Sequence, residues 1–122
     1  MGQTSQLRNT ITEELKKVCK NVYYQNASTK AKYPYLVYGL KAFTVDGFRK
    51  YQLEINICDM SADTSGIEYL GDELEKELGE TFILNDFHHL SFYVNTRNNP
   101  TETNKDLKKC RILFDINYFG RQ

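Results

Sequence analysis

Residues that commonly build catalytic and metal-binding sites are scarce in this sequence of 122 residues, which has two histidines and three cysteines. The cysteines are odd in number and far apart, so they fit neither a disulfide framework nor the paired spacing of a zinc site. The histidines, His88 and His89, are adjacent, and adjacent residues of a strand point to opposite faces, which disfavours shared metal binding. We therefore expect no metal, no cofactor and no catalytic residue.

An enzyme of the Cys-His type is one alternative, with Cys58 as the nucleophile and His89 as its base. Such a pair also needs a group that orients the base, and the sequence shows no local signature of one. Gly66 and Gly71 lack the lysine and the spacing that a phosphate-binding loop requires. The composition thus favours a binding or structural protein over an enzyme.

Long apolar runs are also missing. No segment approaches the roughly 20 apolar residues that a membrane-spanning helix needs. The first residues, MGQTSQLRNT, have neither the basic nor the apolar region of a signal peptide. These absences predict a soluble, intracellular protein with no membrane partner.

Neither sign of charge dominates, because 16 basic and 16 acidic residues give a net charge of zero. The charges are segregated, however: residues 1–50 have nine Lys or Arg against three Asp or Glu, and residues 51–100 have two against ten. Nucleic-acid affinity comes mainly from phosphate neutralisation, so we expect no direct nucleic-acid partner. Segregated charge on a neutral chain favours self-association instead. A nucleic-acid-binding module would need one stripe made of Lys16, Lys17, Lys20, Lys30 and Lys32, with Tyr23 and Tyr24 stacked between them.

Residues 33–59, YPYLVYGLKAFTVDGFRKYQLEINICD, contain two apolar runs joined by Asp46-Gly47. This dipeptide tolerates positive φ at both central positions of a type I′ hairpin turn. The turn would place Val45 opposite Phe48 and would align the two runs, because side chains alternate between the faces of a strand. The hairpin would then present one apolar face to a core, made of Leu36, Tyr38, Leu40, Leu53, Ile55 and Ile57.

The other face of this hairpin also carries apolar residues among polar ones, which predicts a second surface that a partner buries. Strands of about ten residues, roughly 33 Å long, would extend past a small core, so the turn should project. Acidic residues of a following helix are the expected partners of the hairpin's basic residues across a contact between subunits. The predicted interface consists of Tyr35, Val37, Phe43, Phe48, Lys41, Arg49 and Lys50 on the hairpin, with Glu73 and Glu77 on the helix.

The remaining elements follow from periodicity. Apolar residues at helical spacing from Leu7 to Val22 predict a helix over residues 4–22. Ser65 and Glu68 form a capping-box pattern before a second helix, over residues 66–80. Alternation predicts strands over residues 90–94 and 110–118. The polar segment 95–106 between them predicts a mobile loop.

The order helix, β-hairpin, helix, β-hairpin predicts one α+β domain over residues 1–122. Helices that follow hairpins in this order pack together on one face of an antiparallel sheet. We expect the six apolar hairpin residues on that covered face.

The sequence resembles the small tail terminator and tail-completion proteins of tailed bacteriophages and prophages over nearly its whole length. The resemblance rests on Tyr33-Pro34 at the first strand, Asp59 at the end of the second, and Ile67-Glu68 at the start of the acidic helix SGIEYLGDELEKEL. It implies a virion structural protein without catalytic residues, which docks as a ring, usually of six copies, on a completed tail tube and offers a surface to the head connector.

The resemblance implies three partners: further copies of this chain, the tail tube protein, and the head connector or neck protein. It also implies a location in the host bacterial cytoplasm during assembly, and at the tail–neck junction of the virion afterwards. A neck or head-completion (stopper) protein and a head-to-tail joining protein are alternatives within the same assembly, because they share small α+β domains.

Overall fold

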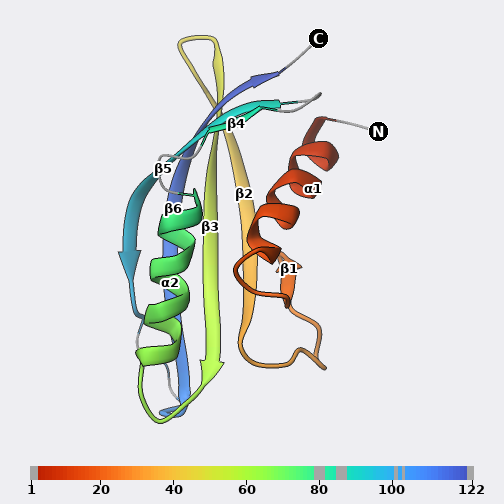
Figure 1. The fold of residues 1–122 in the computed structure, drawn as a ribbon. Helices are drawn as coiled ribbons and strands as arrows, with labels where there is room; N and C mark the ends of the chain where they lie inside the picture. Colours follow the sequence, from red (N-terminus) through yellow and green to blue (C-terminus); the bar gives the residue numbers. More distant parts are fainter. Residues whose placement is uncertain (1–2, 79–81, 85–87, 101, 103, 121–122) are drawn as a thin grey trace.

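The structure, a computed structural model, describes residues 3–78, 82–84, 88–100, 102 and 104–120. Two helices pack on one face of a six-stranded sheet with the order β1-β2-β3-β6-β5-β4, so the α+β class is confirmed (Figure 1). The elements are α1 (Gln3–Lys16), β1 (Val22–Tyr24), β2 (Tyr35–Val45), β3 (Phe48–Met60), α2 (Ser65–Leu78), β4 (Phe82–Leu84), β5 (His88–Asn98) and β6 (Leu107–Gly120).

The β2–β3 hairpin has the predicted turn and register. Asp46 and Gly47 both have positive φ, 51° and 82°, and Val45 lies opposite Phe48. Five of the six predicted core residues of the hairpin are buried beneath the helices, and Leu40, nearer the turn, is half-buried. Pairing of β3 with β6 begins at Lys50, so residues 44–49 lie beyond that pairing, and the turn lies beyond both helices (Figure 1).

The core is one cluster beneath the two helices. Leu7, Ile11 and Leu15 of α1 are fully buried against it, as the helical spacing requires. The α2 residues of this cluster are Ile67, Leu74 and Leu78. Strands β5 and β6 contribute Leu90, Phe92, Cys110, Ile112, Phe114 and Ile116. Both hairpin strands and both helices therefore contribute to a single apolar layer.

The first helix is shorter than predicted, because it ends at Lys16 and not at residue 22. The backbone N–H groups of Lys17 and Val18 donate to carbonyls three residues back, which closes the last turn tightly. Val18 and Val22 still pack against the core, but from a turn and a strand. Their spacing therefore fitted a helix although the chain had already changed direction.

Two short strands were not predicted, and the sheet is not wholly antiparallel. β1 lies in the segment expected to be helix and loop, and it pairs in parallel with β2, with Val22 opposite Leu36. β4 pairs with the start of β5. Three-residue strands carry too few side chains for an alternation pattern, so only their neighbours in the fold define them.

The second helix begins one residue earlier than predicted, at Ser65, and its cap differs. The Thr64 carbonyl accepts the first helical hydrogen bond, from the Glu68 N–H, and the Thr64 hydroxyl donates to the Glu68 carboxylate. Thr64 therefore caps this helix, and Ser65 is its first residue. The Asp63 carboxylate accepts from the Ser65 hydroxyl and N–H, which lowers the pKa of Asp63. The predicted end at residue 80 lies outside the described residues.

The last two strands are longer than predicted, and part of the predicted loop is strand. Residues 95–98 belong to β5, beyond an irregularity in its pairing with β6 between Val94 and Thr96. Mobility of the shorter connection that follows stays a prediction. The Asp106 carbonyl in it accepts from the Ser61 N–H at 2.8 Å.

Candidate interaction surface

One face of the sheet carries no helix, and we call it the uncovered face. Tyr35, Val37, Lys41 and Phe43 of β2 lie on it, since they alternate with the buried residues, and Lys50 lies opposite Phe43. The structure thus brings five of the predicted interface residues onto one surface. The side chains of Phe48 and Arg49 lie outside the described part of the structure. Whether this surface binds a partner stays a prediction.

An aromatic cluster that the sequence did not indicate lies at one end of the uncovered face. The Tyr35 ring contacts Tyr23 edge-on at 6.0 Å between centroids and Tyr33 at 5.3 Å. Cys58 lies opposite Tyr35 in the strand pairing and is buried. Burial raises the pKa of the Cys58 thiol, which keeps the thiol protonated and weakly nucleophilic. This cluster escaped prediction because it depends on β1.

Alkaline pH is expected to weaken this cluster. Burial raises the pKa of Tyr35 from its ordinary value of 10.0 to about 12. A phenol whose pKa is raised by folding stabilises the folded state fully below pH 10, and that contribution is lost as the pH rises toward 12. Denaturant unfolding at pH 8 and pH 11 should show a larger loss for the parent than for Tyr35→Phe, which has no phenol to ionise. Equal losses would contradict the burial of this hydroxyl.

A shallow hollow of about 370 Å³ lies near the projecting end of the uncovered face. Phe43 and Tyr93 line it, with side chains 37% and 47% exposed, together with Lys50 and Asp115. Tyr93 was not predicted as an interface residue, although its place next to the buried Phe92 on an alternating strand indicated this face. The hollow joins the hairpin to β5 across β6 and presents two aromatic rings to solvent.

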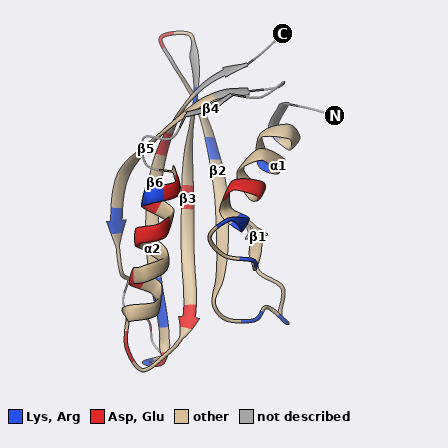
Figure 2. Cartoon of the chain, in the orientation of Figure 1, with Lys and Arg blue, Asp and Glu red and all other residues tan. Residues whose placement is uncertain are grey.

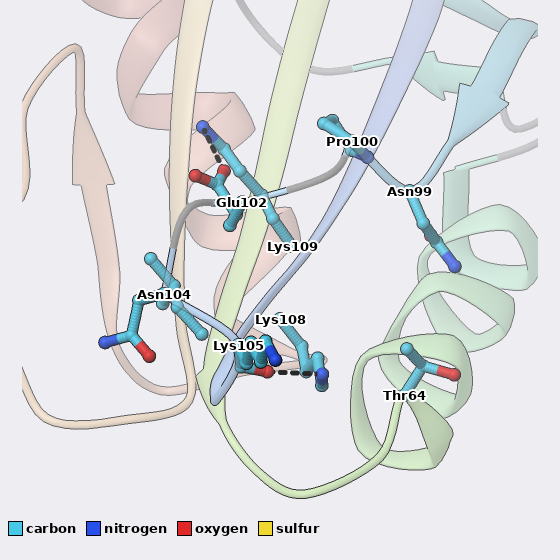
Figure 3. Close-up of a pocket in the computed structure, with 9 residues that line it drawn as sticks. Thr64, Asn99, Pro100, Glu102, Asn104, Lys105, Lys108 and Lys109 are labelled. Carbon is cyan, nitrogen blue, oxygen red and sulfur yellow. Dashed lines mark hydrogen bonds and ion pairs between the residues drawn. The ribbon is translucent and has the colours of Figure 1, made fainter.

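A second hollow, of about 380 Å³, lies beside the start of β6 and is lined partly by Lys105, Lys108 and Lys109 (Figure 3). Two of these lysines already have partners. Lys108 Nζ donates to the Lys105 carbonyl, and Lys109 Nζ lies 3.7 Å from a Glu102 carboxylate oxygen. The carboxylate makes this hollow a poor site for a phosphate group.

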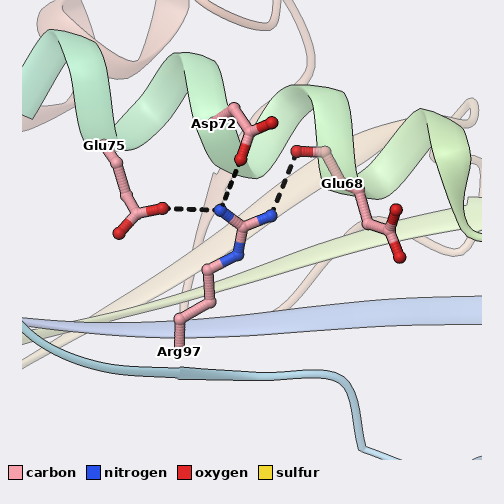
Figure 4. Close-up of polar contacts among 4 residues, drawn as sticks. All are labelled: Glu68, Asp72, Glu75 and Arg97. Carbon is pink, nitrogen blue, oxygen red and sulfur yellow. Dashed lines mark hydrogen bonds and ion pairs between the residues drawn. The ribbon is translucent and has the colours of Figure 1, made fainter.

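Arg97 joins the end of β5 to α2 (Figure 4). Its Nη1 donates to Asp72 Oδ1 at 2.7 Å and to Glu75 Oε2 at 2.5 Å, and its Nη2 donates to the Glu68 carbonyl at 3.1 Å. Burial alone would lower the pKa of Arg97, but the hydrogen bonds to the two carboxylates outweigh it and raise that pKa. This contact was not predicted, because Arg97 falls within residues 95–106, which were expected to form a loop.

The acidic residues of α2 lie on the helix layer, away from the uncovered face (Figure 2). A Glu77 carboxylate oxygen lies 3.7 Å from Lys17 Nζ, so Glu77 links α2 to the turn that follows α1 within the chain. Glu73 is half-buried on the same helix. A contact that pairs Glu73 and Glu77 with Lys41 and Lys50 therefore has to join the helix layer of one copy to the uncovered face of another.

The structure does not bring together the residues that the two alternative functions, a Cys-His enzyme and a nucleic-acid-binding module, would need. Along β6, Cys58 is level with Lys109 and His89 with Phe119, a separation of ten residues or roughly 33 Å, so the Cys-His pair does not form. Within the described residues, no group of three His, Cys, Asp or Glu is placed to hold a metal ion.

The two tyrosines of the nucleic-acid-binding stripe, Tyr23 and Tyr24, lie on opposite faces of the sheet. Tyr24 packs on Tyr38 at 5.2 Å and beneath Arg8, whereas Tyr23 packs on Tyr35 on the uncovered face. The two rings therefore cannot line one path between the lysines. In the part of the chain that the structure describes, no helix is long and apolar enough to cross a membrane.

No protein-family model matches the sequence, and no curated protein matches it. The fold, in contrast, is similar to that of a chain in the virion of a native gene transfer agent (GTA) particle. The TM-score is 0.65 at 9% sequence identity, and the similarity covers 85% of this chain and 83% of that chain. At this identity the likeness shows a shared fold, and it extends over most of both chains.

Proposed function

We propose that this protein is a structural component of a tailed, phage-like virion, which caps the completed tail tube as a ring and joins the tail to the head connector. The observation that carries the proposal is the fold shared with a chain of a gene transfer agent virion over 85% of this sequence. The resemblance of the strand and helix motifs to tail terminators supports the finer assignment. Assembly would take place in the bacterial cytoplasm, with the protein ending at the tail–neck junction.

The arrangement of the surface fits a ring. A ring of identical subunits is a head-to-tail assembly, in which each copy offers two different surfaces. Here Tyr35, Lys41, Phe43 and Lys50 of the hairpin lie on the uncovered face by strand alternation, and α2 with its acidic residues lies on the other side of the sheet (Figure 2). The proposal assigns no catalytic role, and the interface residues stay those of the hairpin and of α2. The copy number of six rests on the resemblance.

Inactivation of the gene in the strain that produces the particles tests the proposal. A tail terminator halts tube polymerisation, so its loss is expected to give tubes of excessive and variable length, unattached to heads. Electron microscopy of lysates would show this, with complementation by the intact gene as the control. Loss of a stopper, the second candidate, would instead leave tails of normal length beside unjoined heads. Normal particles in the absence of the protein would contradict both assignments.

A further inference from the structure

The sheet has two open edges among its described residues. β1 pairs with β2 only as far as Tyr38, so residues 40–45 have no described strand on that side. β4 pairs with β5 only as far as Ser91, so residues 94–98 of β5 have none on the opposite side of the sheet. An open edge offers a row of backbone N–H and C=O groups to any strand that approaches.

The backbone of β2 shows which groups are on offer. The Leu36 N–H donates to the Asn21 carbonyl and the Tyr38 carbonyl accepts from the Gln25 N–H, so the even-numbered residues of β2 face β1 and not β3. By the alternation of an antiparallel pair, Leu40, Ala42 and Thr44 continue this row beyond the end of β1. Ala42 and Thr44 are exposed, and no proline interrupts the row.

The two open edges are complementary in direction and position. Leu40 is level with Val94 through Leu53 and Phe114, and from that level the two open segments extend in opposite directions. β2 and β5 are antiparallel to each other in the sheet, so the β2 edge of one copy meets the β5 edge of the next as an antiparallel pair.

The offset between the edges has the size that a closed ring needs. The centres of the open segments differ by about four residues, roughly 13 Å along the strands. Three strand spacings separate them within one copy, and a fourth crosses to the next copy, roughly 19 Å in all. An offset of roughly 13 Å along the strands over roughly 19 Å across them corresponds to strands tilted by about 35° to the ring axis. This tilt lies within the range of closed barrels.

We infer that copies of this chain join edge to edge, with residues 40–45 of one copy pairing with residues 94–98 of the next, so that the sheets form one continuous barrel around the ring. The inference deepens the proposed function, from which it takes the ring. In such a barrel the helix layers of all copies lie on one side of the joined sheets, so the sheet edges close the ring in place of a contact between α2 of one copy and the uncovered face of the next. Phe43 and Tyr93, which rim the hollow on the uncovered face, lie beside this junction.

Hydrogen exchange on the unmodified protein tests the inference directly. In dilute protein the amides of Leu40, Ala42 and Thr44 should exchange fast, while those of Lys41 and Phe43, which bond to β3, should be protected. In the concentrated, assembled protein all five should be protected. Assembly that leaves the three even-numbered amides fast, or the absence of self-assembly at every attainable concentration, overturns the inference.

Proline substitutions provide a second test. The alternation, counted across the sheet from β2, makes Tyr93 the residue that bonds to Asp115 of β6 and leaves the Val94 N–H facing outward. Proline is tolerated on a strand edge where its missing N–H served no pairing within the chain, so Ala42→Pro and Val94→Pro should each fold but remain monomeric. Ala42→Thr keeps the N–H and should assemble like the parent. A mixture of the two proline variants retains one intact edge of each kind, so it should form heterodimers and no rings in native mass spectrometry. Normal assembly of either variant alone would refute edge pairing.

The inference and the proposed function fail separately. Mass spectrometry of purified particles shows whether the protein is a virion component, whatever its mode of pairing. Particles that contain the protein, with the amides of Leu40, Ala42 and Thr44 unprotected, would retain the proposed function and remove the edge pairing. Particles that lack the protein would remove the proposed function, while protection of those amides in the purified protein would still establish the edge pairing.

Discussion

Replacement of Ile55 by aspartate is expected to unfold this protein. Ile55 is fully buried at the centre of β3, opposite Tyr38 of β2 and Ile112 of β6. An unpaired carboxylate in that layer costs several kcal/mol, in addition to the lost burial of the isoleucine side chain. Domains of this size are stable by about 5–15 kcal/mol in total, so one such change removes most of the free energy of unfolding.

Circular dichroism and urea unfolding would measure the effect, and Asn56→Asp is the matched control. Asn56 is the next residue of the same strand, half-buried on the uncovered face and opposite Arg111. The same carboxylate there faces a cation and solvent, so its cost should stay within about 0.5 kcal/mol, as for most surface substitutions. A cooperative unfolding transition of Ile55→Asp at the parental urea concentration would place Ile55 outside the core.

The hairpin could be predicted because two independent signals agree in it. Asp46-Gly47 set the turn, and the apolar alternation from Leu36 to Ile57 set the face, so a shift by one residue would have exposed the whole apolar set. Both signals are local in sequence. They were sufficient for the register and for the covered face, and with the helical stripes they were sufficient for the α+β class.

The elements that escaped prediction depend on contacts between distant segments. β1 is a strand because Val22 and Tyr24 lie beside Leu36 and Tyr38, and nothing in the three residues themselves indicates this. The end of α1 was misplaced for the related reason that Val18 and Val22 pack on the core in either conformation. Periodicity records which side chains are buried, but it does not record which neighbour buries them.

The candidate surface likewise contains residues that the sequence could place and residues that it could not. Tyr35, Val37, Lys41 and Phe43 could be assigned to one face from strand alternation alone. Tyr23 and Tyr93 joined that face only through pairings that the sequence does not show. The open edges are a property of the whole sheet, since an edge is open only where no other strand covers it.

Arg97→Ala is expected to lower the free energy of unfolding by about 1–2 kcal/mol, because hydrogen bonds to charged groups are worth more than neutral ones. The expected loss is small because the Asp72 side chain is 72% exposed, so solvent weakens the ion pair between Asp72 and Arg97. Glu75, 34% exposed, and the Glu68 carbonyl contribute more. Arg111→Ala is the control: its single ion pair with Glu54, more than 40% exposed on both sides, should cost under about 1 kcal/mol.

The close approach of Arg97 to Gly71 distinguishes the Arg97 contact from an ordinary surface ion pair. A Cβ at this buried position of α2 would lie 2.6 Å from an Arg97 guanidinium nitrogen, so Gly71→Ala has to displace the arginine from its carboxylate and carbonyl partners. Each single variant should therefore lose much of the same interaction. In a double-mutant cycle by urea unfolding, the combined variant should cost less than the two single costs added together. Additive costs would show that Arg97 contributes nothing through its position over Gly71.

Because Arg97 also lies in the open segment of β5, its loss should loosen the edge that accepts the next copy. Arg97→Ala should therefore weaken assembly, while Arg111→Ala leaves assembly unchanged.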